Sequence, residues 1–153
     1  MTDAAGIYAR ESSILDRHVQ TGVAGERVLA VSFPDEPDEQ AGSDHPLLDR
    51  IESYLEGERD DFADVTVALT VPTDRRSVLE ALRDVPYGED VSVEQLTRMT
   101  PGLDPEEASD RETVRMALRE NPAPLLLPDH RVRDGPSAAP SDVVDQLRRI
   151  EGL

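Results

Sequence analysis

The sequence predicts an α+β fold, with a small sheet-and-helix lobe over residues 1–71 followed by a mostly helical region over residues 72–153. In the first half, short apolar runs rich in β-branched residues alternate with turn formers, which is typical of strands. After about residue 72 the apolar residues recur every three or four positions, which is typical of helices. Chains of about 150 residues bury about 68–70% of their unfolded surface, so we expect one domain or two small lobes.

The first lobe is predicted to contain strands and one helix. The candidate strands are residues 27–33 and 65–71, with residues 7–8 and 19–20 as weaker candidates. Residues 34–44 form an acidic connector that contains proline and has nothing to bury. Residues 45–55 carry apolar side chains at helical spacing and are followed by Gly57, a typical helix stop. One helix packed on a small sheet is the expected result.

The second region begins with two predicted helices. Thr73 is a candidate N-cap for a helix that runs to about residue 84. Ser92 and Gln95 have the spacing of a capping box, in which each side chain bonds the backbone of the other, and this predicts a short helix to about residue 99.

Two more helices follow. Ser109 and Glu112 form a second candidate capping box for a helix ending near residue 121, and three short helices in succession suggest a helix-turn-helix. Residues 123–128 are apolar and bounded by proline, so we expect a buried extended run. Ser141 is a candidate cap for a final amphipathic helix.

Composition excludes several function classes. The chain has no Cys, so it has no disulfide, thiolate zinc site or thiol nucleophile. No apolar run approaches 18 residues and no signal peptide precedes the first strand candidate, so we expect a cytoplasmic protein without a membrane partner. There are 33 acidic residues against 16 cationic ones, all Arg, and the net charge is −17. Because salt screens such self-repulsion, we hypothesise a high-salt cytosol, as in a halophilic archaeon.

Two strings carry the most specific information. Residues 85–96 read V-P-Y-G-E-D-V-S-V-E-Q-L, and residues 121–132 read N-P-A-P-L-L-L-P-D-H-R-V. Together they resemble the C-terminal domain of the methylated-DNA–protein-cysteine methyltransferases, with motifs similar to I-P-Y-G-E-x-x-S-Y-x-x-L and N-P-x-P-I-x-I-P-C-H-R-V. The resemblance covers about residues 73–153. It implies a ribonuclease H-like first lobe and a winged-helix (helix-turn-helix) DNA-binding domain.

The resemblance also implies where the chemistry would lie. In the family one Cys, activated through a His and a Glu, accepts an alkyl group from the O6 atom of a flipped-out guanine, without a cofactor. Here Asp129 stands at the position of that Cys, and no catalytic residue is expected. The degenerate site that remains consists of Asp129, His130, Glu151 and Asn121. The three His residues of the chain lack ligand spacing, so no metal site is predicted.

The expected DNA contacts also depart from the family pattern. Val93 replaces a Tyr that helps to rotate the nucleotide, and Glu112 takes the register of an Arg that fills the vacated stack. Arg115 and Met116 replace a small Gly-Gly-like pair. The residues that we expect to contact DNA are Arg111, Arg115, Arg119, Arg131, Ser92 and Val93. The three Arg spaced by four share a helix face, where they could bind phosphates or pair with neighbouring acids.

Three functions therefore stay open. The first is an alkyltransferase-like protein that binds double-stranded DNA with alkylated guanine, transfers nothing, and passes the site to other repair proteins. The second is an interaction or scaffold module on the same fold without DNA binding. The third is a residual hydrolytic or acid–base activity of Asp129 and His130. In each case we expect a monomer.

Overall fold

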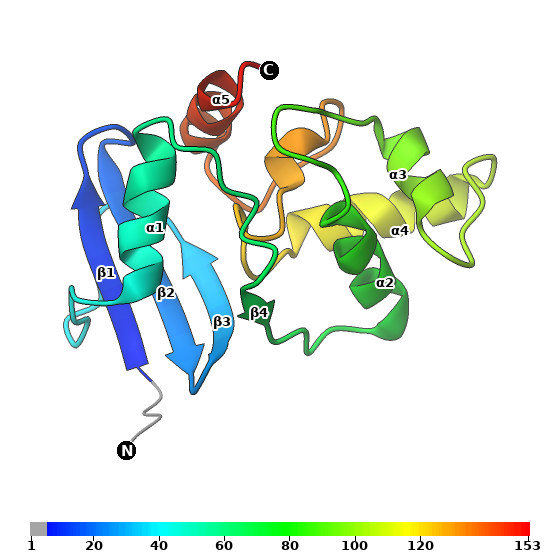
Figure 1. Cartoon of the computed structure of the whole chain (residues 1–153). Coiled ribbons are helices and arrows are strands. Elements are labelled where there is room, and N and C mark those ends of the chain that lie inside the picture. Colours follow the sequence, from blue (N-terminus) through cyan, green and yellow to red (C-terminus); the bar gives the residue numbers. More distant parts are fainter. Residues whose placement is uncertain (1–5) are drawn as a thin grey trace.

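The computed structural model describes residues 6–153. Its sheet has the order β1-β2-β3-β4, with the first three strands antiparallel and β4 parallel to β3 (Figure 1). The strands are β1 (Gly6–Ser12), β2 (Arg17–Ala24), β3 (Arg27–Ser32) and β4 (Thr66–Val67). The two weaker strand candidates are therefore full strands that pair as a hairpin. The predicted strand over residues 65–71 is wrong in length, because only two of its residues pair with β3.

One face of the sheet is covered by helix α1 (Pro46–Leu55). Val19, Thr21 and Val23 of β2 are buried in alternation, which places them toward one face. The α1 helix supplies a matching buried stripe, and His45 caps it by accepting a hydrogen bond from the backbone of Leu47 at 3.1 Å. The predicted helix-on-sheet lobe is confirmed.

The second region contains three helices before the final one. These are α2 (Thr73–Leu82), α3 (Val93–Met99) and α4 (Ala108–Arg119), and α4 packs against both of the others. The turn η1 (Asp129–Arg131) and helix α5 (Ser141–Ile150) follow. The mixed α+β fold is confirmed, whereas the winged-helix assignment and the lobe boundary near residue 71 stay predictions. No helix within residues 6–153 is long and apolar enough to cross a membrane.

The predicted helix caps are confirmed at one position and wrong at three. Ser92 and Gln95 form the capping box at the start of α3. Thr73 and Ser141 are instead the first helical residues, because the preceding prolines already hold the extended conformation of an N-cap. Ser109 lies inside α4, which begins at Ala108.

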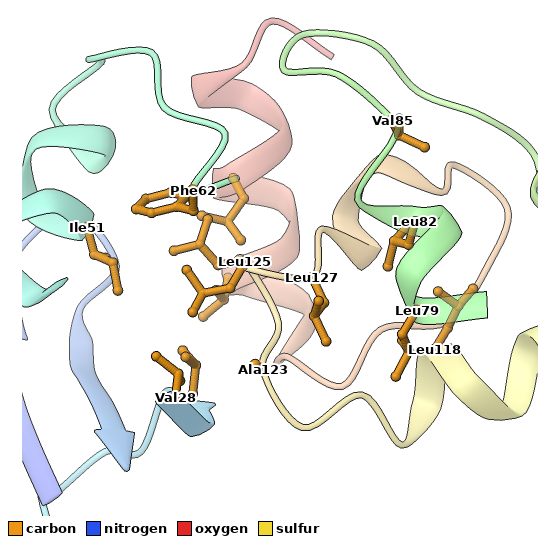
Figure 2. Packing of buried hydrophobic residues seen from close by; sticks show 14 of the residues in the cluster. Val28, Ile51, Phe62, Leu79, Leu82, Val85, Leu118, Ala123, Leu125 and Leu127 are labelled. Carbon is orange, nitrogen blue, oxygen red and sulfur yellow. The ribbon is translucent and has the colours of Figure 1, made fainter. Parts of the chain in front are cut away.

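Within residues 6–153, one apolar core joins the two regions. In Figure 2, Val28, Ile51 and Phe62 lie on the sheet side, whereas Leu79, Leu82 and Leu118 lie on the helical side. Between them runs the chain that carries Ala123, Leu125 and Leu127. The backbone amide of Val31 also donates to the carbonyl of Pro122 at 2.9 Å. The segment after α4 is thus held from both sides, and this fixes the position of the residues that follow it.

Candidate functional site

The site begins with a tight turn after α4 that Asn121 holds from inside. The Asn121 side chain donates to the carbonyl of Leu127 at 2.8 Å and accepts from the amide of Ala123 at 2.9 Å. Leu125 adopts a φ of 84°, in the left-handed region that bulky residues rarely enter. The segment is buried as predicted, but the extended conformation is wrong at its centre, because the chain reverses there to bring Pro124 beside Leu127.

Asp129 lies at the end of this turn and is only 2% exposed. Its carboxylate accepts three hydrogen bonds, from Ser137 Oγ at 2.6 Å, Asn121 Nδ2 at 3.0 Å and the amide of Ala138 at 3.1 Å. Burial raises the pKa of Asp129, and hydrogen bonds from Ser137, Ala138 and Asn121 oppose that rise. No cation is paired with this carboxylate within residues 6–153. The three hydrogen bonds therefore replace those to water that the carboxylate loses on burial.

Residues 133–140, here called the closing loop, cover Asp129. The loop is fixed at its start as well, since the carboxylate of Asp134 accepts from the amide of Val93 at 2.7 Å. Gly135 packs so closely that an added Cβ would lie 2.8 Å from Leu118 Cδ1. The closing loop is therefore held by packing at one end and by Asp129 at the other.

A second buried network centres on Glu151, just after α5. Its carboxylate accepts from Arg131 Nε at 2.8 Å, from His130 Nε2 at 2.7 Å, from the amide of Gly88 at 3.1 Å and from the hydroxyl of Tyr54. Burial opposes ionisation of Glu151, but the hydrogen bonds from His130 and Arg131 outweigh it and hold its pKa well below the usual range. Burial and the adjacent carboxylate raise the pKa of Tyr54. Because Tyr54 lies on α1, the network ties the two regions together.

One polar atom in this network has no partner within residues 6–153, namely His130 Nδ1. Glu151 is ionised and accepts from Nε2, so Nδ1 is the nitrogen left free. His130 is 1% exposed, and no cluster of potential metal ligands is present in the described part of the chain. A ligand or water that reached this imidazole would meet Nδ1.

The expected DNA-contacting residues are found in two settings. Arg111, Arg115 and Arg119 lie on α4 at the surface. Arg119 and Arg115 both pair with Glu112, at 2.6 and 3.8 Å, and Arg111 Nη1 donates to the carbonyl of Pro105 at 2.5 Å. The cations of this face are therefore engaged by the protein's own groups.

The remaining three expected contacts lie deeper. Arg131 is 2% exposed and held by Glu151, and Val93 is 1% exposed, so neither side chain faces solvent. Both side chains pack inside the protein, and the DNA contact expected for them stays a prediction. Ser92 is half-buried, with its hydroxyl used in the capping box of α3.

Comparison with known proteins identifies the family. No protein-family model matches the chain. The methylated-DNA–protein-cysteine methyltransferase of Methanopyrus kandleri is 33% identical over 109 residues, which cover 69% of this chain and 77% of that protein. The chain belongs to the methylated-DNA–protein-cysteine methyltransferase family. Another member, from Metallosphaera sedula, is 33% identical over 86 residues, or 56% of this chain, and the match spans only about half (51%) of its length. The DNA base-flipping protein of Thermus thermophilus is 35% identical over 107 residues, 69% of this chain and 68% of its own length.

Solved structures of methyltransferases show the same fold. A variant of the Mycobacterium tuberculosis O6-methylguanine methyltransferase matches with a TM-score of 0.74 over 97% of this chain and 92% of its own, at 21% identity. The O6-methylguanine-DNA methyltransferase of Pyrococcus kodakaraensis matches with a TM-score of 0.68 over 98% of this chain and 100% of its own, at 19% identity. The sheet lobe followed by a helical region is therefore the methyltransferase fold.

Within this family, the structure brings together the residues expected from the motifs in two pairs. Asn121 contacts Asp129, and His130 contacts Glu151. Ser137, Ala138 and Tyr54 also belong to the site, and sequence reasoning missed them. Tyr54 was visible only as part of the apolar stripe of α1, and nothing in the local sequence marks Ser137 and Ala138 as partners of a carboxylate.

Proposed function

We propose that the chain binds double-stranded DNA with alkylated guanine and does not accept the alkyl group. The observation that carries this proposal is Asp129, which stands where the family's acceptor Cys is expected, inside a loop whose other partners are present. Alkyl transfer in the family needs a thiolate, and the chain has no Cys. The Asp129 carboxylate is a poor nucleophile toward a soft alkyl carbon, and its oxygens are already engaged by three donors.

The comparisons support the DNA-related part of the proposal. One relative is a DNA base-flipping protein, and one structural neighbour, the Mycobacterium tuberculosis methyltransferase with a TM-score of 0.68 at 19% identity, was solved in complex with DNA. These properties belong to those proteins. Their shared family supports a DNA-repair role here. We propose further that the bound site passes to other repair proteins.

The direct test is the fluorescence anisotropy of labelled duplexes with the intact protein. We expect tighter binding to a duplex with one O6-methylguanine than to the same duplex with guanine. Because the chain carries a charge of −17, the measurement should be made over a range of salt that includes molar KCl. Equal affinity for the two duplexes at every salt concentration would refute lesion binding.

The Asp129→Cys variant tests whether the missing thiol is what prevents transfer. We expect the thiolate of this variant to take the methyl group from O6 and leave unmodified guanine in the duplex, since the His130–Glu151 pair remains in place. Because the methyl group replaces the thiol proton, the protein mass should rise by one CH2 unit. The matched control is Asp129→Ser, which offers a hydroxyl and should gain nothing. If Asp129→Cys binds the lesion but takes no methyl group, the site differs from the family's in more than the thiol.

For the DNA-contacting surface we propose Arg111, Arg115 and Arg119 of α4, with Ser92 at the start of α3. On DNA binding, Arg115 and Arg119 would release Glu112 and bind phosphate groups instead. In the parent protein, the logarithm of the DNA-binding constant should decrease with the logarithm of the salt concentration. In the Arg115→Gln/Arg119→Gln variant, this negative slope should become shallower by about 0.9 for each lost phosphate contact.

The control for this variant removes two cations elsewhere. Arg27 lies at the start of β3, and Arg149 lies on α5 and donates to Gln146. The Arg27→Gln/Arg149→Gln variant has the same net charge as the α4 variant and should keep the salt slope of the parent protein. Equal slopes for the two variants would exclude α4 as the contact surface.

A scaffold function without DNA binding is the second candidate. It is favoured by the pairing of the α4 cations with Glu112, and by a further pair between Arg75 and Glu120 at 2.7 Å. The absence of any duplex binding, together with binding of a protein partner, would select this function.

A residual activity of Asp129 and His130 is the third candidate. It requires a carboxylate that can act on a substrate, whereas Asp129 is buried and hydrogen-bonded to Asn121, Ser137 and Ala138. Loss of a hydrolytic activity on alkylated DNA in Asp129→Ala would support it, and an equal rate of hydrolysis by the parent and by Asp129→Ala would remove it.

The proposal includes a cytoplasmic monomer adapted to a high-salt cytosol. Its support is the large excess of acidic residues over Arg. Light scattering at low and molar KCl tests the monomer, and a dimer mass at both concentrations would contradict it.

A further inference from the structure

Two cavities meet at the turn between β1 and β2. The larger, about 340 Å³, lies between this turn and the C-terminal half of α1. The second, about 300 Å³, lies between the same turn and α5. Ile14 lines both cavities and is 37% exposed. We call the combined surface the turn groove. Its larger part is at the small end of the range of about 300–1,000 Å³ found for ligand pockets, which suits one large side chain.

The floor of the turn groove is apolar and already ordered. Leu48 and Leu55 of α1 line it together with Val19 of β2. The turn above them is fixed, because the amide of Leu15 donates to Ser12 Oγ at 3.2 Å and Leu15 itself is buried. An apolar side chain that entered would therefore contact a preformed surface, with little loop ordering to oppose binding.

The rim of the turn groove is acidic. Glu11, Glu52 and Glu56 surround the larger cavity, and Asp142 and Asp145 line the second. The cations nearby are largely engaged. Arg10 pairs with Asp49 and Glu52 at 2.6 and 3.0 Å, and Arg17 pairs with Asp142 at 3.1 Å. Arg149, which lines the second cavity, donates to the neutral Gln146 and keeps its charge, so the acidic excess is greatest around the larger cavity. Within residues 6–153, no ion pair neutralises Glu11, Glu56 or Asp145.

We propose that the turn groove is a docking site for a basic peptide segment of another protein. One aliphatic or aromatic side chain of the segment enters the larger cavity beside Ile14, and Arg or Lys residues on either side of it meet Glu11, Glu56 and Asp145. The acidic rim selects a cationic partner by charge complementarity. A second copy of this chain, with its charge of −17, would be repelled.

The turn groove lies away from the proposed DNA surface. In Figure 1 the β1–β2 turn and α1 are on one side of the molecule and α4 is on the other. A peptide in the groove would leave Arg115 and Arg119 accessible. The proposal is therefore independent of DNA binding, and the two can fail separately.

The experiment uses the full chain and a phage-displayed library of random 12-residue peptides. Selected peptides should contain an aliphatic or aromatic residue flanked by Arg or Lys, and their affinity should fall as salt rises. A synthetic peptide of the best selected sequence, labelled with fluorescein, is then measured by anisotropy. Selection of acidic peptides, or of none, would overturn the proposal.

Two variants of exposed residues locate the binding surface. Glu11→Arg/Glu56→Arg reverses the charge of two rim residues and should weaken binding of the selected peptide by about tenfold or more. Ile14→Ser should also weaken binding, because it removes the apolar contact. The matched control, Glu26→Arg/Glu36→Arg, makes the same charge change at exposed positions outside the groove. Equal losses in the rim variant and the control would show that net charge alone binds the peptide, and would refute the groove.

Discussion

Asp129 can be replaced in two ways that separate its hydrogen bonds from its charge. Asp129→Asn keeps an acceptor for Asn121 and the amide of Ala138, and its new NH2 group can donate to Ser137 Oγ. Asp129→Ala loses all three bonds, which measure 2.6, 3.0 and 3.1 Å. At about 1 kcal/mol for each bond, the Asn variant should be more stable than the Ala variant by about 3 kcal/mol. For a chain of this length that corresponds to about 6–12 °C in Tm.

The charge of Asp129 gives the same experiment a pH dependence. Burial raises the pKa of Asp129, so the folded state binds the proton more tightly than the unfolded chain does. The stability linked to that proton is present below the unfolded pKa of 3.8 and is lost as pH rises through the raised folded pKa. At neutral pH the parent protein holds a buried charge that Asp129→Asn lacks. The Asn variant should then exceed the parent in stability at pH 7, with an advantage that shrinks toward pH 4.

Urea unfolding followed by circular dichroism, at several pH values between 4 and 8, measures both effects. The comparison of Asn with Ala is insensitive to the charge, because both variants lack it. The reasoning would be refuted if Asp129→Asn were as unstable as Asp129→Ala, since the hydrogen bonds would then contribute nothing. A constant difference between the parent and Asp129→Asn across this pH range would refute the effect assigned to the charge.

Three further outcomes are expected. Glu151→Gln should destabilise the fold by about 3–5 kcal/mol in urea unfolding, because it leaves the buried Arg131 with only the half-exposed Asp61, 3.3 Å away, as a charge partner. Glu151→Gln should also reduce the loss of stability at acid pH. The lowered pKa of Glu151 gives stability that is present above its unfolded value of 4.5 and is lost as pH falls. An unchanged loss of stability at acid pH would contradict this. Gly135→Ala should cost about 1–3 kcal/mol through the clash of its Cβ with Leu118 and Val132 at 2.8 and 2.9 Å, whereas an unchanged Tm would show that the closing loop moves freely. The Tm of the parent should rise with KCl up to molar concentrations because the charge is −17, and full stability at low ionic strength would count against a high-salt origin.

The sequence predicted those parts of the fold that depend on local patterns. The capping box of Ser92 and Gln95 needs four consecutive residues, and it forms as expected. Strand β1 was only a weak candidate, marked by residues 7–8, and the charged Arg10 follows soon after them. In the structure Arg10 points toward α1, where Asp49 and Glu52, about 40 residues away in the chain, neutralise it. No local rule could show that this cation is compatible with a covered sheet face.

In the candidate site, too, the parts that depend on local sequence were predicted and the parts that depend on distant contacts were not. The motif marked Asn121, Asp129, His130 and Glu151, and the structure pairs them as two contacts. It did not reveal that Asp129 would be covered. That depends on the closing loop, whose path is fixed by the packing of Gly135 against α4 rather than by a pattern in its own residues.

The covered carboxylate has a consequence for DNA affinity. A base that reached Asp129 would have to displace Ser137 and Ala138, which together hold the closing loop with two hydrogen bonds. At about 1 kcal/mol each, these bonds favour the closed position of the closing loop over the open one by about 2 kcal/mol. The population of the open loop, and with it the apparent affinity for DNA, is then about thirtyfold lower. Asp129→Ala removes both bonds, so it should bind the methylated duplex more tightly than the parent although it is less stable. Anisotropy with both proteins at one salt concentration measures the ratio, with the unmodified duplex as control. A loss of affinity would mean that the carboxylate itself contacts the base, and the closing loop would then not be the barrier.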